Sequence, residues 1–342
     1  MLRKGMGLAL AALLAGGSLA ACGDSEPPVP SPKAATSSGS RPAASIQNFA
    51  RISKRVLSAV NANDKDLTTD KLEQTTVGPM TVIRGAQYNT RRLLGDSYPI
   101  VSLATDVKKN QVAISAAKGY PRLSMAVMDP VKGTNLPALN VFSQGGAREN
   151  WRLWGTLEVL PKAEFPSIEG GKTGAEFISA DSGKGLVASP KQVIEGYVNL
   201  NQTRTDGKGL NFAEDSVRKA LQQDSDKNNS SVSGAGKATM TFAVGDNGPV
   251  ALRTSDGGAV VVAQMNYFTT MSSDSGHTVT VGGPIGGIAT GKAGGKVKLD
   301  GNTLTASSTL LVAFKVPAAK AKDKTISVIA SGKSVTLSAK VQ

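Results

Sequence analysis

The sequence predicts an α+β protein of two domains, each with N-terminal helices followed by an antiparallel sheet. Helical periodicity occurs in two clusters, residues 46–94 and 189–221, and each cluster is followed by strand-like sequence alone. Strands that follow one another without intervening helices pair antiparallel, which distinguishes this class from alternating α/β folds. A glycine-rich stretch, 169–187, separates the two clusters. The 297 residues from Ile46 onward also exceed one typical core, so the prediction is domains at 46–168 and 188–342.

The first domain is predicted to begin with two helices. Apolar residues recur every three or four positions from Phe49 to Val60, which predicts an amphipathic helix over 46–61. A second helix is predicted over 79–94, since its proline suits a first turn and Gly95 suits a C-cap. Alternating or apolar runs then predict strands at 100–105, 111–116, 124–128, 138–142 and 151–160.

The second domain is predicted to repeat this order. Ser189 to Gln192 has the form of a capping box that opens a helix, and a second helix start is predicted at Asn211. Residues 224–236 are polar and predict a loop, and hairpin turns are predicted at 300–302 and 331–333. Strands are predicted at 239–244, 259–267, 278–281, 296–299, 308–316, 325–329 and 334–340.

The N-terminus has the three regions of an export signal. Basic residues at positions 3 and 4 precede an apolar run over 6–14, which is too short for a stable membrane-spanning helix. Leu19-Ala20-Ala21-Cys22 follows and resembles the lipobox of bacterial lipoproteins. The resemblance implies that residues 1–21 are a signal peptide and that Cys22 receives a diacylglycerol and, at its new amine, a fatty acid such as palmitate. An ordinary secretory signal with an incidental cysteine is the alternative.

Residues 22–45 are rich in proline and serine and predict a tether that holds the domains away from the membrane. The predicted location is therefore the extracytoplasmic face of the cell membrane, with the lipid bilayer as the partner of acylated Cys22.

Two broader resemblances concern the region that follows the tether. Tyr120-Pro121-Arg122 together with Trp151 and Trp154 resembles uncharacterised actinobacterial surface lipoproteins over roughly residues 46–165. The order of helices then strands resembles the NTF2-like and cystatin-like superfamilies, which implies strongly curved antiparallel sheets. Trp151 and Trp154 are expected on opposite faces of a strand. One of them is expected in the core, and the other is expected either in the core, at a rim or against a ligand.

The composition excludes many catalysts. The chain has one histidine, His277, and Cys22 is its one cysteine, so Cys–His catalysis and a His/Cys zinc site lack residues. No metal, cofactor or catalytic residue is expected, although a hydrolase that uses two distant carboxylates stays open. Residues 286–292 match Gly-x-x-x-x-Gly-Lys, but Ala293 stands where a P-loop needs a hydroxyl. The range 282–295 is therefore predicted to be a flexible loop between strands.

Positive charge concentrates at the C-terminus. Residues 291–342 hold nine lysines against two aspartates, a net +7, whereas residues 166–290 carry a net −2. Lysine suits diffuse attraction to anionic envelope polymers or an acidic envelope protein, and nucleic acid is not expected as a partner. The candidate binding residues are Lys315, Lys320, Lys322 and Lys324. Alternatively, the lysines protect strand edges from aggregation.

Three functions follow from these observations. The leading hypothesis is a membrane-anchored lipoprotein that acts as a non-enzymatic binding or scaffold module of the cell envelope. The alternative is a carrier that holds a small apolar or amphipathic ligand in a curved-sheet pocket, lined by residues such as Met80, Val82, Met125 and Val127. A carboxylate-dependent hydrolase is the third.

Overall fold

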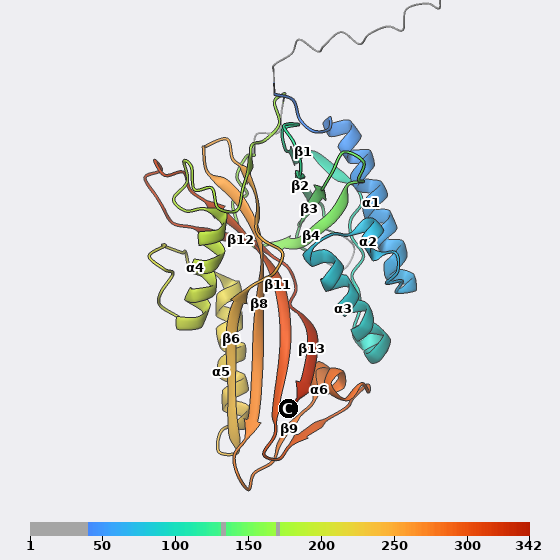
Figure 1. Ribbon diagram of the computed structural model, residues 1–342, viewed down its shortest axis with the longest axis vertical. Coiled ribbons are helices and arrows are strands. Elements are labelled where there is room, and N and C mark those ends of the chain that lie inside the picture. Colours follow the sequence, from blue (N-terminus) through green and yellow to red (C-terminus); the bar gives the residue numbers. More distant parts are fainter. Residues whose placement is uncertain (1–39, 131–134, 169–171) are drawn as a thin grey trace, which may run out of the picture. The chain divides into compact units, whose positions relative to one another are not determined.

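Two long strands, β8 (Ala259–Ser273) and β11 (Thr303–Val316), pair antiparallel along their whole length and form the spine of the fold (Figure 1). The computed structural model describes residues 40–130, 135–168 and 172–342, and Gly39–Gln342 form one compact unit. Cys22, the predicted signal peptide and most of the predicted tether lie outside the described residues.

Each spine strand pairs with two shorter strands placed one after the other along its outer edge. β7 (Val250–Arg253) and β6 (Gly236–Val244) follow the edge of β8, while β12 (Ser327–Ser331) and β13 (Val335–Val341) follow that of β11. The sheet has eleven strands, and all its pairings between these strands are antiparallel. Beyond β12 the sheet continues through β4 (Arg152–Val159), β3 (Ala138–Gln144), β2 (Arg122–Met128) and β1 (Val107–Ile114). Beyond β7 it continues to β5 (Phe177–Ile178).

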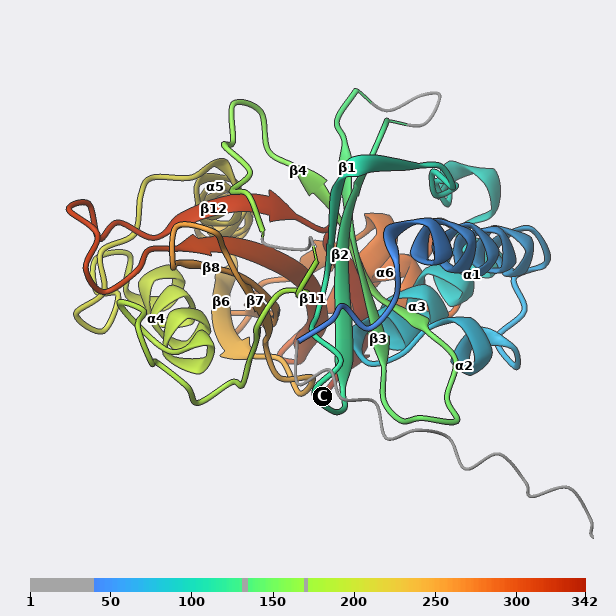
Figure 2. The same ribbon diagram turned by 90° about the horizontal axis from the view of Figure 1, so that it is seen from above.

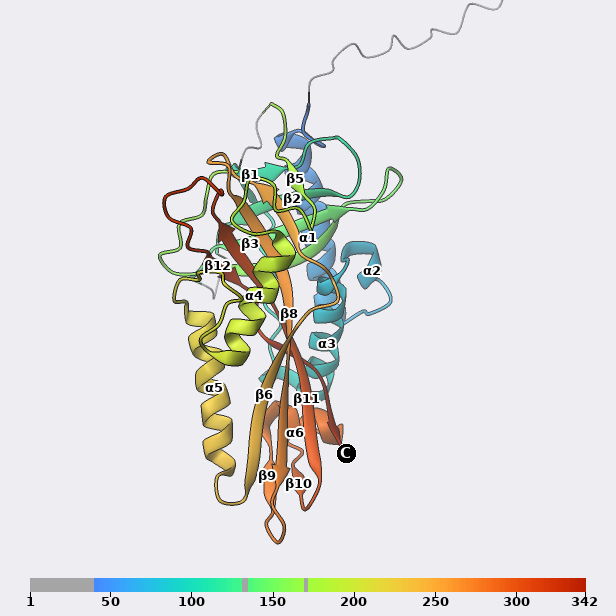
Figure 3. The same cartoon turned by 60° about the vertical axis from the view of Figure 1, so that its left-hand side comes forward.

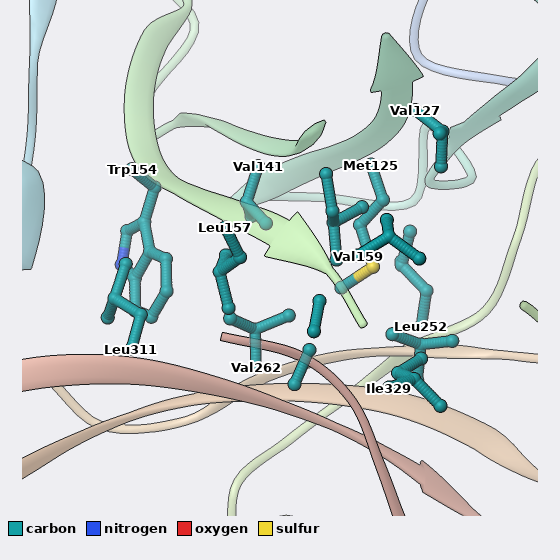
Figure 4. Close-up of a cluster of buried hydrophobic side chains, with 14 of the residues drawn as sticks. Met125, Val127, Val141, Trp154, Leu157, Val159, Leu252, Val262, Leu311 and Ile329 are labelled. Atoms are coloured by element: carbon teal, nitrogen blue, oxygen red, sulfur yellow. The ribbon is translucent and has the colours of Figure 1, made fainter. Parts of the chain in front are cut away.

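The sheet folds back on itself around a hydrophobic cluster. Side chains of β2 to β4, such as Met125, Val141 and Leu157, face Val262 and Leu311 of the spine (Figure 4). Alternation along β11 sends neighbouring side chains to opposite faces, so both faces of the spine are buried.

Helices cover the outer faces of this folded sheet. Helix α1 (Ile46–Asp66) packs on β1 to β4, and α4 (Pro190–Thr203) packs on the other face of the spine. Viewed from above, α1 and α4 lie on opposite sides of the sheet (Figure 2). α5 (Ser216–Val232) runs alongside β6 (Figure 3). The remaining helical segments are α2 (Leu72–Thr75), α3 (Pro79–Leu94), α6 (Gly283–Thr290) and the 3₁₀ turn η1 (Gly95–Ser97).

Local signals located three helices well. α1 begins at Ile46 as predicted and extends five residues further, and α3 has the predicted bounds with Gly95 as its C-cap. α4 begins with the predicted capping box, in which the Ser189 hydroxyl and the Gln192 side chain each accept from the other's backbone N–H.

Tertiary packing overrode local composition in two other helices. The second helix of the C-terminal half begins at Ser216 instead of Asn211, with Asp215 as its N-cap, and continues through most of the predicted polar loop. The predicted loop over 282–295 contains α6, whose Ile285 and Ile288 pack against the cluster of β9 (Val279–Val281) and β10 (Val297–Leu299). Gly286 allows this approach, because a Cβ there would lie 2.5 Å from the Val281 carbonyl oxygen.

Three predicted features, one strand and two hairpin turns, are also absent from the described residues. The range 100–105 is not a strand but a loop that lies against α1 and α3. The predicted hairpin turn at 331–333 is a break between β12 and β13, which follow the same edge of β11. The turn at 300–302 joins β10 to β11, which do not pair.

The α+β class and the antiparallel pairing are confirmed, whereas the arrangement of two NTF2-like domains is not. Strands of 46–168 and 188–342 share one sheet, because β4 pairs with β12 through Val159 and Ala330. The same hydrophobic cluster draws side chains from both ranges. Part of the predicted linker, 169–187, contributes β5, which pairs with β7. The division into two folding units stays a prediction.

Candidate functional site

The main candidate site lies where the sheet divides. β12 pairs with both β11 and β4, whereas β13 continues along β11, and the chain passes from β12 to β13 through residues 332–334. At this break the Gly332 N–H donates to the Leu311 carbonyl oxygen over 2.8 Å. The two branches of the sheet separate there, and α3 lies across the opening.

A cavity of about 280 Å³ occupies this division and is called the fork pocket below. Its volume is near the lower end of the range for small-molecule sites. Apolar side chains form most of its walls, and a few polar groups converge on it. Five segments contribute, namely α3 with Met80, Ile83, Arg84 and Gln87, the loop over 98–104, the two ends of the β2–β3 connection with Asp129, Pro130 and Leu136, the strand pair β3–β4 with Ala138, Asn140, Thr156, Leu157 and Glu158, and the sheet break with Leu311, Gly332, Lys333 and Ser334.

The outer wall of the fork pocket is a loop held by hydrogen bonds from two helices. The Asn61 side chain of α1 donates to the Leu103 carbonyl oxygen over 2.9 Å and accepts from the Leu103 N–H over 2.7 Å. From α3, Arg84 Nη2 lies 3.5 Å from the Val101 carbonyl oxygen. An amide that satisfies both backbone groups of one residue replaces a strand partner, which explains how this loop is held without strand pairing.

A buried ion pair joins α1 to α3 beside the pocket. Arg84 Nη2 lies 3.2 Å from Asp64 Oδ2, and the side chains are only 4% and 6% exposed. The Tyr88 hydroxyl donates to Asp64 Oδ1 over 2.8 Å, and Arg84 Nη1 donates to Gln87 Oε1 over 2.9 Å. Burial raises the pKa of Asp64, while Arg84 and the hydrogen bond from Tyr88 act to lower it.

The same surroundings affect two tyrosines. Burial, and then the hydrogen bond to Asp64, raises the pKa of the Tyr88 hydroxyl. Burial also raises the pKa of Tyr98, which lines the pocket, while the positive charge of Arg84 lowers it. Both hydroxyls are therefore neutral donors at physiological pH.

Asn140 is the unusual polar residue of the site. It is fully buried at the centre of β3, and its neighbours Leu139 and Val141 point to the opposite face, into the cluster between the sheet halves. Neither its Oδ1 nor its Nδ2 has a hydrogen-bond partner within the described residues. Thr156 lies opposite it on β4 and also lines the pocket.

The pocket contains only one of the four residues that the sequence proposed for a ligand cavity. Met80 lines it, whereas Met125 and Val127 belong to the core cluster and Val82 is 45% exposed. Trp151, which immediately precedes β4, and Trp154 on β4 lie in clusters on opposite faces of the sheet, as predicted, and both are core residues, each 6% exposed. The sequence did not single out Arg84 or Asn140. A lone amide within the apolar run 138–142 was the available signal for Asn140.

The four candidate lysines lie together at one end of the spine. Lys315 is on β11, and the other three are exposed on the segment that leads to β12. Lys315 Nζ lies 3.9 Å from Glu164 Oε2, and Asp256 and Asp323 share a surface hollow with Lys315 and Lys320. The lysines of 292–298 precede the opposite end of β11, a strand whose two ends lie roughly 43 Å apart at about 3.3 Å per residue. The C-terminal lysines therefore form separate groups.

Two kinds of feature are absent from the described parts of the chain. In those parts, no helix combines the length and apolar character needed to cross a membrane. Within the same residues, no three histidine, cysteine or acidic side chains are grouped so that they could hold a metal ion.

Comparison with known proteins gives a family but no activity. The family described as "Domain of unknown function (DUF8094)" matches residues 40–336. An "Uncharacterized lipoprotein" of Streptomyces avermitilis is 29% identical over 254 residues, which cover 71% of this chain and 72% of that protein. No solved structure matches the chain.

Proposed function

Because the chain belongs to the DUF8094 family and is similar to a lipoprotein, we propose that it is an extracytoplasmic lipoprotein that binds a small amphipathic ligand in the fork pocket. Acylated Cys22 would hold it at the membrane, and the folded unit that begins at Gly39 would carry the site. The proposed activity is binding without catalysis.

The observation that carries this proposal is the composition of the fork pocket. Apolar side chains from three separate segments, such as Ile83, Leu103 and Leu157, surround a concave space into which a few polar groups converge. A cavity of this kind, apolar with a small number of placed polar groups, is typical of small-ligand sites. Of the sequence-based hypotheses, the small-ligand carrier therefore has the most specific structural support.

A pocket-filling substitution tests the proposal. Ala138 lines the pocket, so Ala138→Phe should occupy part of it, while Ala147→Phe makes the same change on the exposed β3–β4 connection. The uncharged fluorophore N-phenyl-1-naphthylamine should bind the Gly39–Gln342 unit saturably and brighten. Ala138→Phe should weaken this binding at least tenfold, and Ala147→Phe should leave it unchanged. Failure of the parent to bind, or equal binding by both variants, would contradict the proposal.

A second proposal concerns the four lysines of 315–324 as a surface for anionic envelope polymers or an acidic envelope protein. Three of them lie exposed on the segment that leads to β12, and Lys315 lies at the end of β11 that precedes this segment, which supports the proposal. Glu164, Asp256 and Asp323 lie among them and reduce the local charge, so attraction to an anionic surface would be weak and sensitive to salt.

A further inference from the structure

Three segments meet at the end of the folded unit where the described chain begins (Figure 1). They are called the tether end below and comprise residues 40–42, 116–122 and 172–175. The Ala117 N–H donates to the Arg41 carbonyl oxygen over 2.7 Å, and the Ser40 hydroxyl donates to the Thr173 carbonyl oxygen over 2.9 Å. These bonds hold parts of the chain that are far apart in the sequence in one surface.

The tether end is positively charged. No acidic residue occurs in the three segments, and their charged side chains are those of Arg41, Lys118, Arg122 and Lys172. Within the described residues, none of these four cations forms an ion pair. Glu176, which follows the third segment closely, is already paired, because its Oε2 lies 2.6 Å from Arg253 Nε. The positive charge of the surface is therefore not compensated by these neighbours.

An exposed aromatic side chain stands among these cations. Tyr120 is 39% exposed, and among the described residues only three other large hydrophobic side chains are exposed. The guanidinium carbon of Arg122 lies over its ring, 4.4 Å from the centroid. Tyrosine is enriched where proteins meet the boundary between lipid headgroups and hydrocarbon, because its ring is apolar and its hydroxyl stays in contact with water.

We infer that the tether end docks on the anionic surface of the membrane that holds the lipid anchor. Its cations would contact the lipid headgroups, and the ring of Tyr120 would enter the interface. A second copy of this chain is a poor occupant of the same surface, since it would place like charges opposite each other. The fit of charge and of the exposed ring is to an anionic bilayer.

The position of the anchor in the sequence supports this occupant. Gly39 follows Cys22 by 17 positions, so the chain between them can span at most about 60 Å. The tether end is the part of the folded unit closest to Cys22 along the chain, and a covalent link of limited reach raises its effective concentration at the lipid surface. This step rests on one part of the proposed function, the acylation of Cys22.

Vesicle binding by the Gly39–Gln342 unit tests the inference without the anchor. This unit lacks Cys22, the one cysteine of the chain, so acylation cannot cause binding and single cysteines can be introduced for labelling. Vesicles of phosphatidylglycerol and phosphatidylcholine in equal parts should bind at least tenfold more tightly than vesicles of phosphatidylcholine alone. Binding should weaken as the salt concentration rises, because ions screen the attraction.

A combined variant removes the charge and the ring. Lys118→Gln, Tyr120→Ser and Lys172→Gln together should weaken binding to the anionic vesicles at least tenfold, since each basic residue near an anionic bilayer contributes about fivefold. All three side chains are exposed, so the melting temperature should not fall.

The matched control makes the same kinds of change where β8 ends and β11 begins. Lys237→Gln, Lys340→Gln and Val341→Ser remove two exposed lysines and one exposed apolar side chain there. The tether end is linked to the other end of β8, through β5 and β7. The control variant should therefore bind the anionic vesicles nearly as the parent does.

Labels that brighten in apolar surroundings locate the docking surface. A label on Gly119→Cys lies within the tether end, where an added Cβ would meet no atom within 4 Å, and it should brighten with the anionic vesicles. Ser275→Cys, exposed beyond the end of β8, should give an unchanged signal. Ala319→Cys reports on the lysine-rich segment of 315–324, which attracts the same vesicles without an exposed aromatic side chain, and it should brighten less than Gly119→Cys.

Each other outcome would overturn the inference. These outcomes are absence of vesicle binding by the parent, equal loss of binding in the combined variant and its control, and labels at positions 275 or 319 that brighten as much as the label at 119. Soluble polyphosphate that binds as tightly as the vesicles, and through the same residues, would replace the bilayer by a soluble polyanion. None of these results bears on the fork pocket, and fatty-acid labelling of Cys22 tests the anchor separately.

Discussion

Removing Arg84 while leaving Asp64 in place should strongly destabilise the protein at neutral pH. At 3.2 Å and an effective dielectric constant of about 20, two unit charges attract each other by about 5 kcal/mol. Breaking a buried pair by removing one partner typically costs about 3–5 kcal/mol, because the remaining charge stays buried without compensation. Arg84→Met should therefore lower the free energy of unfolding by about 3–5 kcal/mol at pH 7, measured by urea denaturation.

The pH dependence identifies the cause. Burial already raises the pKa of Asp64, and loss of Arg84 removes the charge that opposes this rise. A folded-state pKa above the unfolded value means that the folded state binds the proton more tightly, so stability increases as the pH falls towards the unfolded value. The loss caused by Arg84→Met should thus be smaller at pH 5 than at pH 7.

Two further variants make this reasoning refutable. Asp64→Asn added to Arg84→Met should restore at least about 2 kcal/mol at pH 7, because the uncompensated charge is gone. Arg51→Met, on the exposed face of α1, should change stability by no more than about 0.5 kcal/mol. A loss below about 1 kcal/mol for Arg84→Met, or the same loss at pH 7 and pH 5, would show that the pair does not stabilise the junction of α1 and α3.

Three other predictions concern the anchor, the lysines and the division of the chain. Cys22→Ala should release the protein from membranes or leave it unprocessed, and a fatty-acid analogue should label the parent alone. Label on the variant would refute the prediction that Cys22 is the lipidated residue of a lipobox. Replacing the four lysines of 315–324 with glutamine should weaken sedimentation with anionic vesicles at low salt without lowering the melting temperature, whereas unchanged binding would assign them to solubility. Limited proteolysis should cut within 169–185, and the two fragments should stay associated on gel filtration because β4 pairs with β12 and both fragments share a core. Rapid loss of the whole chain would instead indicate one integrated domain.

Short-range signals were sufficient for much of the secondary structure. The Ser189 capping box and the Gly95 C-cap act within one turn of a helix, so the sequence alone locates these ends of α4 and α3. The glycine-rich α6 and the polar second half of α5 were missed because their helical state depends on packing against strands. Local composition there favours a loop, and contacts with distant residues decide otherwise.

The sheet and the pocket depend on pairings that no local pattern encodes. The alternation of apolar and polar residues in β11 predicts a strand, but it does not indicate that β12 and β13 pair along the same edge of that strand. The division at Gly332 follows from that sharing, and it brings Met80 of α3 beside Ser334, more than 250 positions later in the chain. The sequence could therefore propose a curved-sheet pocket, and even include Met80 in it, without locating its other walls.

The two buried polar features of the pocket differ in what explains them. Arg84 and Asp64 compensate each other and join two helices, so fold stability accounts for their presence. Asn140 joins nothing within the described residues, and its two unpartnered atoms cost about 1–3 kcal/mol each by the usual measure of a buried unsatisfied group. Each of these atoms has less than 1 Å² of accessible surface, so a ligand in the fork pocket cannot reach them, and the folded protein bears this cost alone.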